Sequence, residues 1–508
     1  MSKSRTIMVA KNIYASFIFQ IIGLMINFIN RTIFIRILGI EYLGINGLFT
    51  NVLTILSFAE LGIGNAIIFN MYAPLASRDY ERLKSLINFY KNIYRFIALT
   101  ICTLGLLFIP FIGYLINDQI ISDNIYTIYF FFLLSTTISY LFIHKKSIII
   151  ADQKGYIANF QIQLVRIIRC IIQIVILLVF SNYLLYLAIQ VIFVFLENYA
   201  VSKKADKLYS FIKDKDFVKI KKEEKRKIFE NVRALALYKI GGVALSGSSN
   251  ILISILIGIR PIGLISNYML VIGTLSMILN QITTAFTASI GNLNITATSY
   301  KKENVFNRIL FIVMWIYGFS SIGLLLFLTP LITIWLGYDY TLPTSSIFGL
   351  VSFFYVMGVH RILSTYRIAT GLFIKGRYAP IVAAILNIIL SFILGRSFGL
   401  GGILVSPTIS RFLTNNIVDP ILIYKNVFES NFNVFFIVYG KYLLLFGAIY
   451  FLFDFILKFF VIYNLVTLVL LIICMTILFN IIMFLVFHKS EEFKDITKIL
   501  KNTILSKI

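Results

Sequence analysis

Acidic residues, cysteine and histidine are all scarce in this chain. Only 22 of its 508 residues are Asp or Glu, whereas 46 are Lys or Arg. It has three cysteines and three histidines. The cysteines fall in apolar stretches without paired spacing, so we expect neither a disulfide framework nor a cysteine-based metal site.

Sequence signals for catalysis are also few. No glycine-rich loop ends in Gly-Lys-Ser or Gly-Lys-Thr, so ATP hydrolysis has no support within the chain. His144, His360 and His488 are scattered and form no cluster in the sequence. We interpret the chain as a protein without enzyme activity, and we expect no nucleophilic serine, no cofactor and no metal.

Apolar residues dominate what is present. They make up 59% of the chain, and the mean hydropathy is +0.90. Runs of about 20 apolar residues, long enough to cross a bilayer, recur throughout the chain. Lipid cannot satisfy backbone hydrogen bonds, so these runs should be helices. We predict an all-α, polytopic membrane bundle of about fourteen helices. The predicted spans lie near 12–38, 43–72, 92–116, 125–150, 157–180, 184–201, 234–257, 263–290, 307–332, 344–370, 379–396, 401–424, 440–456 and 464–487.

The distribution of basic residues predicts the topology. The formal net charge is +24, and most Lys and Arg fall in alternate connections that would then be cytoplasmic. Both termini should therefore lie in the cytoplasm. The largest basic segment, residues 203–233, holds twelve Lys and Arg. We interpret it as a solvated connector that contacts anionic membrane lipids, and we expect no nucleic-acid ligand.

A weak internal repeat suggests how the chain is organised. Residues 41–57 align without gaps to residues 260–276, which matches Gly44 with Gly263 at an offset of 219. Six spans per repeat would relate two lobes by a pseudo-two-fold axis along the membrane normal. The predicted parts are an N-terminal lobe at 1–201, a basic cytoplasmic linker at 202–233, a C-terminal lobe at 234–424, and two further helices with a cytoplasmic tail at 425–508.

Basic residues inside the apolar spans are the strongest functional signal. An arginine or lysine at the centre of a spanning helix costs roughly 2.5–3.5 kcal/mol, so several should face a hydrated interior and not lipid. A cavity lined by cations suggests an anionic cargo. The cations that we predict to line a binding site are Arg31, Arg166, Arg169, Lys239, Arg361 and Arg411.

Other charged residues in the spans have simpler interpretations. Glu60 either contacts cargo or neutralises Arg31 across two helices. Arg166 and Arg169 share a helical face, and neither has an acidic neighbour on its own span. Three further arginines lie near span ends, where we expect them to reach the headgroups: Arg36, Arg95 and Arg367.

Several segments resemble a known family of transporters. The segments are LGIEYLGINGLFTNVLTILSFAELGIGNAI (38–67), ADQKGYI (151–157), ISNYMLV (265–271) and GLFIKGRYAPIVAAILNIILSFILG (371–395). They resemble Wzx-type polysaccharide flippases of the multidrug/oligosaccharidyl-lipid/polysaccharide (MOP) exporter superfamily. The resemblance implies two six-helix lobes plus two helices, and transport of undecaprenyl-diphosphate-linked O-antigen or capsule repeat units. Relatives often carry an acid near Asn250, which we include among the predicted site residues.

The resemblance also implies a cellular location, partners and alternative functions. We expect a monomer in the bacterial cytoplasmic (inner) membrane that works by alternating access between leaflets. Its partners would be the undecaprenyl-diphosphate oligosaccharide and anionic lipids, with a polysaccharide polymerase as a further candidate. Three alternatives stay open: a peptidoglycan lipid-precursor flippase, a multidrug or cation antiporter of the same superfamily, and a membrane oligosaccharide polymerase.

Overall fold

The computed structural model describes residues 22–505 except 61–62, 117–120, 214–217, 219, 221, 371 and 373–374. Secondary structure in these ranges is helical, without strands. Nine of the described helices are long and apolar enough to cross a membrane, or eleven if each of two bent pairs counts as one span. The predicted all-α, polytopic membrane fold is confirmed. The chain forms two compact units, Met1–Gly263 and Leu264–Ile508.

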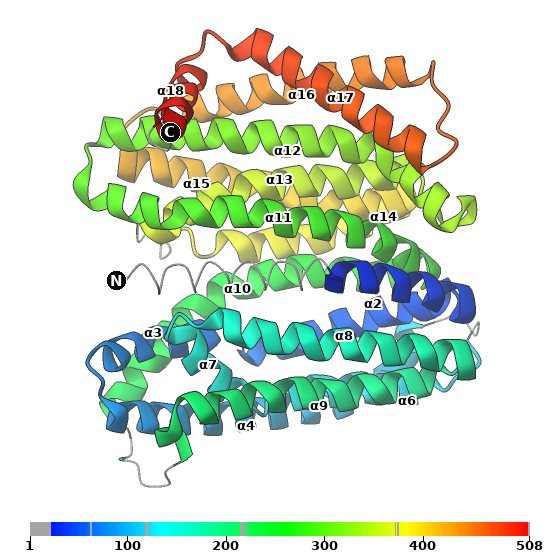
Figure 1. Ribbon diagram of the computed structural model, residues 1–508, viewed down its shortest axis with the longest axis vertical. Helices are drawn as coiled ribbons and strands as arrows, with labels where there is room; N and C mark the ends of the chain where they lie inside the picture. Colours follow the sequence, from blue (N-terminus) through cyan, green and yellow to red (C-terminus); the bar gives the residue numbers. More distant parts are fainter. Residues whose placement is uncertain are drawn as a thin grey trace. The chain divides into compact units, whose positions relative to one another are not determined.

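The first unit is built from antiparallel helices joined by short turns (Figure 1). The helix Ile22–Leu38 meets α2 (Ile40–Leu56) at 119°, and the turn residue Gly39 has a φ of 98°, a conformation that favours glycine. The helices that follow are η1 (Ser57–Glu60), α3 (Ile63–Ala76), α4 (Tyr80–Phe108), η2 (Ile109–Phe111), α5 (Ile112–Leu115), α6 (Ile125–Ser139), α7 (Ile143–Ala151), α8 (Gly155–Phe180), α9 (Tyr183–Leu208), η3 (Ser210–Lys213) and α10 (Lys222–Leu256).

The predicted second span, 43–72, is interrupted. The α-helix ends at Leu56, a 3-10 turn covers Ser57–Glu60, and helix resumes at Ile63. Ser57 lies at the break, where its hydroxyl donates a hydrogen bond to the carbonyl of Leu53 at 2.7 Å. The break places the polar side chain of Glu60 in a short turn between two apolar helices.

The basic segment predicted as a linker is largely helical where the structure describes it. Helix α9 continues to Leu208, and α10 starts at Lys222, well before the predicted span at 234. Helix α10 packs against α2 and α3 and belongs to the first unit.

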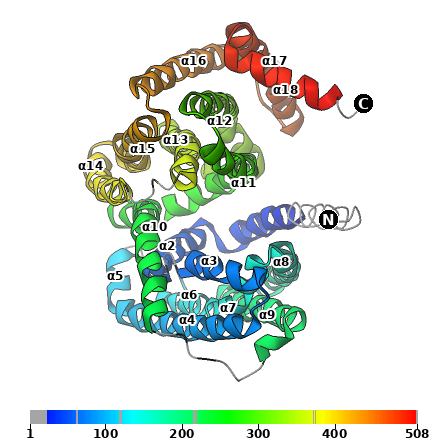
Figure 2. The same cartoon turned by 90° about the vertical axis from the view of Figure 1, so that its left-hand side faces the viewer.

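The second unit packs around α13 (Thr344–Ala369). Of the apolar 18-residue stretch of α13, 72% is buried, whereas 17% of the corresponding stretch of α17 is buried. Helix α13 is therefore a core helix. Figure 2 shows α13 between α12 and the α14–α15 pair. The helices of this unit are α11 (Arg260–Thr296), α12 (Ser299–Leu336), η4 (Tyr338–Tyr340), α13, α14 (Ala379–Leu413), α15 (Asn415–Ile423), η5 (Tyr424–Phe428), α16 (Asn433–Leu457), α17 (Leu465–Phe487) and α18 (Glu491–Leu505).

Helix α14 contains two predicted spans joined by a single glycine. The backbone leaves the helical region at Gly399, where φ is 59° and ψ is −139°. Just before it, residues 395–399 have the Gly-x-Ser-x-Gly spacing of a nucleophile elbow, a match that contradicts the expectation of no such serine signal. Ser397 lies within helix and donates to the carbonyl of Ile393 at 3.2 Å, so the strand–turn–helix context of a nucleophile is missing here.

Two glycines allow residues 259–263, where α11 begins, to approach α2 closely within the first unit. A Cβ atom at Gly44 would lie 2.4 Å from the carbonyl oxygen of Ile259, and one at Gly263 would lie 2.3 Å from that of Ile40. Such distances are possible only without side chains, as in other close packings of membrane helices. The two glycines matched by the internal repeat thus lie at the same contact.

Candidate functional site

Arg166 forms an ion pair with an acid on another helix. Its guanidinium donates two hydrogen bonds to Glu197 on α9, from Nη2 to Oε1 at 3.0 Å and from Nε to Oε2 at 3.2 Å. Glu197 is mostly buried, whereas the Arg166 side chain is 48% exposed. The acid that pairs with Arg166 therefore comes from the neighbouring helix α9 and not from its own span.

We expect the Arg166–Glu197 pair to add little to stability, because the Arg166 side chain is 48% exposed and ion pairs with an exposed member contribute about 0–1 kcal/mol. Glu197→Gln should therefore lower the free energy of unfolding by no more than about 1 kcal/mol. Thermal melting in detergent would measure the change, and Glu81→Gln, which removes an exposed pairing with Lys84, is the matched control. A drop of several kcal/mol in the Glu197 variant alone would contradict this expectation.

Arg31 and Arg169 lie near one tyrosine in the first unit. Both act electrostatically on Tyr186 of α9, whose hydroxyl accepts a hydrogen bond from Asn30 at 3.2 Å. The thiol of Cys170 donates to Asn27 at 3.4 Å, which links the helix Ile22–Leu38 to α8. These contacts join the first predicted span to the fifth and sixth.

Glu60 lies in a different neighbourhood from Arg31. Its carboxylate is hydrogen-bonded to the hydroxyl of Tyr140 on α6, and Lys146 on α7 is a nearby cation. Within the part of the chain that the structure describes, no ion pair joins Glu60 to Arg31. The interhelical pair weighed from the sequence is therefore not formed in this structure.

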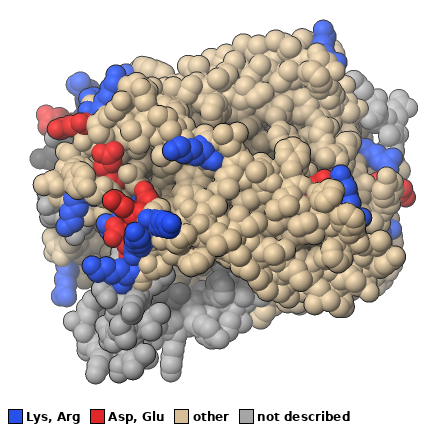
Figure 3. Space-filling model, turned by 90° about the horizontal axis from the view of Figure 1, so that it is seen from above, with Lys and Arg blue, Asp and Glu red and all other residues tan. Residues whose placement is uncertain are grey.

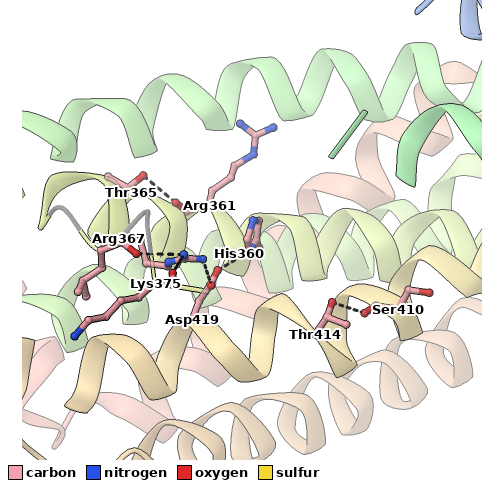
Figure 4. A network of polar contacts seen from close by, with 9 residues as sticks. His360, Arg361, Thr365, Arg367, Lys375, Ser410, Thr414 and Asp419 are labelled. Atoms are coloured by element: carbon pink, nitrogen blue, oxygen red, sulfur yellow. Dashed lines mark hydrogen bonds and ion pairs between the residues drawn. The ribbon is translucent and has the colours of Figure 1, made fainter. Parts of the chain in front are cut away.

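A buried ionic network crosses the second unit (Figure 4). The guanidinium of Arg367, at the end of α13, donates to the carboxylate of Asp419 on α15 and to the carbonyl oxygens of Leu372 and Lys375. Nδ1 of His360 lies 3.4 Å from the other carboxylate oxygen. The side chains of Arg367 and Asp419 are 1% and 0% exposed. The expectation that Arg367 reaches the headgroups is therefore wrong.

The remaining predicted cations of the second unit lie on either side of this network. Arg411 is buried on α14 and acts electrostatically on Asp419 and His360. Arg361 lies beside Tyr317 of α12, and Figure 4 shows its side chain pointing away from Asp419. Arg411 therefore belongs to the environment of the buried acid, whereas Arg361 does not.

Two predicted residues lie on α10. The side chain of Lys239 is outside the described residues. Asn250 is partly buried, and its amide nitrogen would lie 3.8 Å from a Cβ atom at Gly47 of α2. Asn250 is therefore placed at the packed contact between α2 and α10.

The ADQKGYI segment forms a tight turn between α7 and α8. Gln153 has a φ of 58°, and Lys154 pairs with Asp152 at 2.6 Å. The hydroxyl of Tyr209, just beyond α9, donates to Asp152 at 2.7 Å. Burial, assisted by this hydrogen bond, raises the pKa of Tyr209, so the phenol keeps the proton that it donates. The segment therefore has a structural role in fastening the end of α9.

Charged side chains are unevenly distributed on the face of the molecule shown in Figure 3. On the face shown in Figure 3, Lys, Arg, Asp and Glu gather toward the two ends of the helices, and most of the surface between them is uncharged. Large apolar side chains such as Leu444, Phe451 and Leu485 are exposed on α16 and α17. This distribution suits helices whose flanks contact lipid.

Comparison with known proteins identifies the class of fold. No family model matches the chain, and no curated protein matches its sequence. Solved structures of transporters do match. A MATE multidrug-resistance transporter of the MOP superfamily, inward-facing, has a TM-score of 0.60 at 14% identity and covers 78% of this chain and 92% of its own. The Vibrio cholerae MATE transporter VcmN has a TM-score of 0.56 at 11% identity, covering 84% and 100%.

The lipid II flippase MurJ, in an inward closed conformation, has a TM-score of 0.64 at 17% identity. The match covers 93% of this chain and 99% of MurJ. The chain therefore has the fold of MOP-superfamily transporters, as the resemblance implied.

Proposed function

We propose that the protein is a flippase for lipid-linked oligosaccharides. It would move undecaprenyl-diphosphate-linked repeat units from the cytoplasmic to the outer leaflet of the bacterial cytoplasmic membrane by alternating access. Both termini would then lie in the cytoplasm, and the units would belong to an O-antigen or capsule. The fold of MOP transporters supports a transport function, and the sequence motifs support this branch.

The observation that carries the proposal is that two cations in the predicted spans have no carboxylate partner among the described residues. Arg169 in the first unit and Arg361 in the second form no ion pair with a carboxylate among the described residues. A lipid diphosphate carries about two negative charges, and a guanidinium suits phosphate because its planar fork donates paired hydrogen bonds. A cationic drug as cargo would instead require available carboxylates; Glu197 and Asp419 are already paired, which leaves Glu60 among these acids of the spans.

A peptidoglycan-precursor flippase is the second candidate. The likeness to MurJ favours it, and the same diphosphate chemistry would serve both cargoes. The two candidates differ in the sugars that accumulate when transport stops.

Deletion of the gene should cause undecaprenyl-diphosphate oligosaccharides to accumulate and surface polysaccharide to disappear, as measured by mass spectrometry of extracted lipids. Complementation with Arg169→Gln should restore export at least roughly tenfold less well than wild type, because a charge-assisted hydrogen bond contributes about 1.5–3 kcal/mol. Arg169→Lys should rescue in part, since the charge is kept and the fork is lost.

The control is Arg396→Gln, which removes a cation stacked on Phe392 at 4.3 Å, beside the Gly399 reversal. This variant should export normally. Full export by a well-expressed Arg169→Gln protein would show that Arg169 is not part of the binding site. Accumulation of lipid II after deletion of the gene would favour the second candidate.

A further inference from the structure

A hollow in the first unit has chemistry unlike that of the cationic residues. It has a volume of about 450 Å³, within the range of small-molecule sites. Helices α2, α6, α9 and α10 and the turn η1 supply its walls. Hydroxyl side chains, Gln190 and Glu60 form its polar lining, and no Lys or Arg lines it among the described residues.

Three hydroxyl protons in this hollow are already engaged. Thr54 donates to the carbonyl of Thr50 at 2.7 Å, Ser57 donates to that of Leu53 at 2.7 Å, and Thr136 donates to that of Phe132 at 2.9 Å. A hydroxyl has one proton and two lone pairs, so each of these oxygens can still accept a hydrogen bond. These three side chains thus offer acceptors to a ligand.

Two further polar groups line the hollow. The Glu60 carboxylate accepts hydrogen bonds only, and the Tyr140 hydroxyl already contacts it. The hydroxyl of Ser135 is buried without a hydrogen-bond partner, so it is free both to donate to a ligand and to accept from one.

We infer that this hollow binds the sugar end of the cargo and selects neutral or amino sugars over acidic ones. The inference rests on the proposed function. Sugar hydroxyls and amide or ammonium groups donate the hydrogen bonds that the walls accept. A uronate or a phosphate would bring a second negative charge next to Glu60, and two like charges at one site disfavour each other. The diphosphate and the sugar would therefore contact separate groups of residues.

The test is native mass spectrometry of the full chain with three lipids. They are undecaprenyl diphosphate without sugar, the same lipid carrying a neutral N-acetylhexosamine disaccharide, and the same lipid carrying a uronic-acid disaccharide. The wild-type protein should bind the neutral-sugar lipid about tenfold more tightly than the sugar-free lipid, corresponding to about 1.4 kcal/mol. The uronate lipid should bind no more tightly than the sugar-free lipid.

Variants locate the effect. Thr54→Val and Ser57→Ala together should abolish the sugar-dependent gain and leave binding of the sugar-free lipid unchanged. Glu60→Gln should reduce the preference for neutral over acidic sugar. Thr100→Val is the matched control, because Thr100 makes the same helix contact, to Phe96 at 2.9 Å, outside the hollow. The Thr100→Val protein should still bind the neutral-sugar lipid about tenfold more tightly than the sugar-free lipid.

The outcomes separate the two proposals. Equal binding of all three lipids, or an undiminished gain in the Thr54→Val, Ser57→Ala protein, would overturn the sugar site and leave the flippase proposal standing. Tighter binding of the uronate lipid would reverse the inferred selectivity. Binding of none of the three would overturn the flippase proposal and the sugar site together.

Discussion

Asp419→Asn should lower the free energy of unfolding by about 3–5 kcal/mol, the cost of breaking a fully buried ion pair. The carboxylate accepts from Arg367 and lies 3.4 Å from His360, and neither Asp419 nor Arg367 is exposed to solvent. An amide of the same size keeps the volume and removes the charge, so the guanidinium loses its counter-charge inside the protein. The expected readout is a much lower melting temperature in detergent and poor expression.

The matched control is Asp454→Asn. Asp454 pairs with Lys458 at 3.4 Å, but the two side chains are 43% and 71% exposed, so its loss should cost less than about 1 kcal/mol. Replacing Arg367 and Asp419 together by leucine should recover much of the lost stability, because two buried charges are removed at once. Equal melting temperatures for wild type, Asp419→Asn and Asp454→Asn would show that the network does not hold the second unit together.

Gly263→Val should disrupt the close approach of residues 259–263 to α2 within the first unit. The added Cβ atom would lie 2.3 Å from the carbonyl oxygen of Ile40 and 3.2 Å from the nitrogen of Gly44. These are backbone atoms that cannot rotate away, so the helices must separate. Overpacking of this kind costs about 1–3 kcal/mol, and we expect the upper end because the obstacle is rigid.

Gly273→Val on the same helix provides the comparison for this effect. A Cβ atom there meets nothing within 4 Å, so the change should leave folding intact. Size-exclusion chromatography and thermal melting of both variants would measure the difference. A Gly263→Val protein as well folded as Gly273→Val would mean that the two glycines do not set the helix spacing.

The apolar spans could be predicted because membrane helices depend mainly on hydropathy and length. The polar partners could not, because they come from other helices. Arg166 had no acid within its own span, and only the packing of α8 on α9 reveals Glu197. Glu197 near the end of the sixth predicted span was the available signal.

Arg367 shows a second limit of sequence reasoning. Its position near a span end predicts exposure at the headgroups. In the structure the chain after α13 folds over it, and the carbonyls of Leu372 and Lys375 and the carboxylate of Asp419 surround the guanidinium. A position near a span end therefore predicts an exposed side chain only where the following loop does not cover that side chain.

The Arg367–Asp419 pair also bears on how this protein is made. The two residues are 52 positions apart. At about 5–20 residues per second, the ribosome adds the acid roughly 3–10 s after the arginine. During that interval the segment of α13 has been synthesised but that of α15 has not, so Asp419 is not yet available to offset the positive charge. During synthesis, the basic end of α13 is therefore present in the nascent chain before the acid that pairs with it.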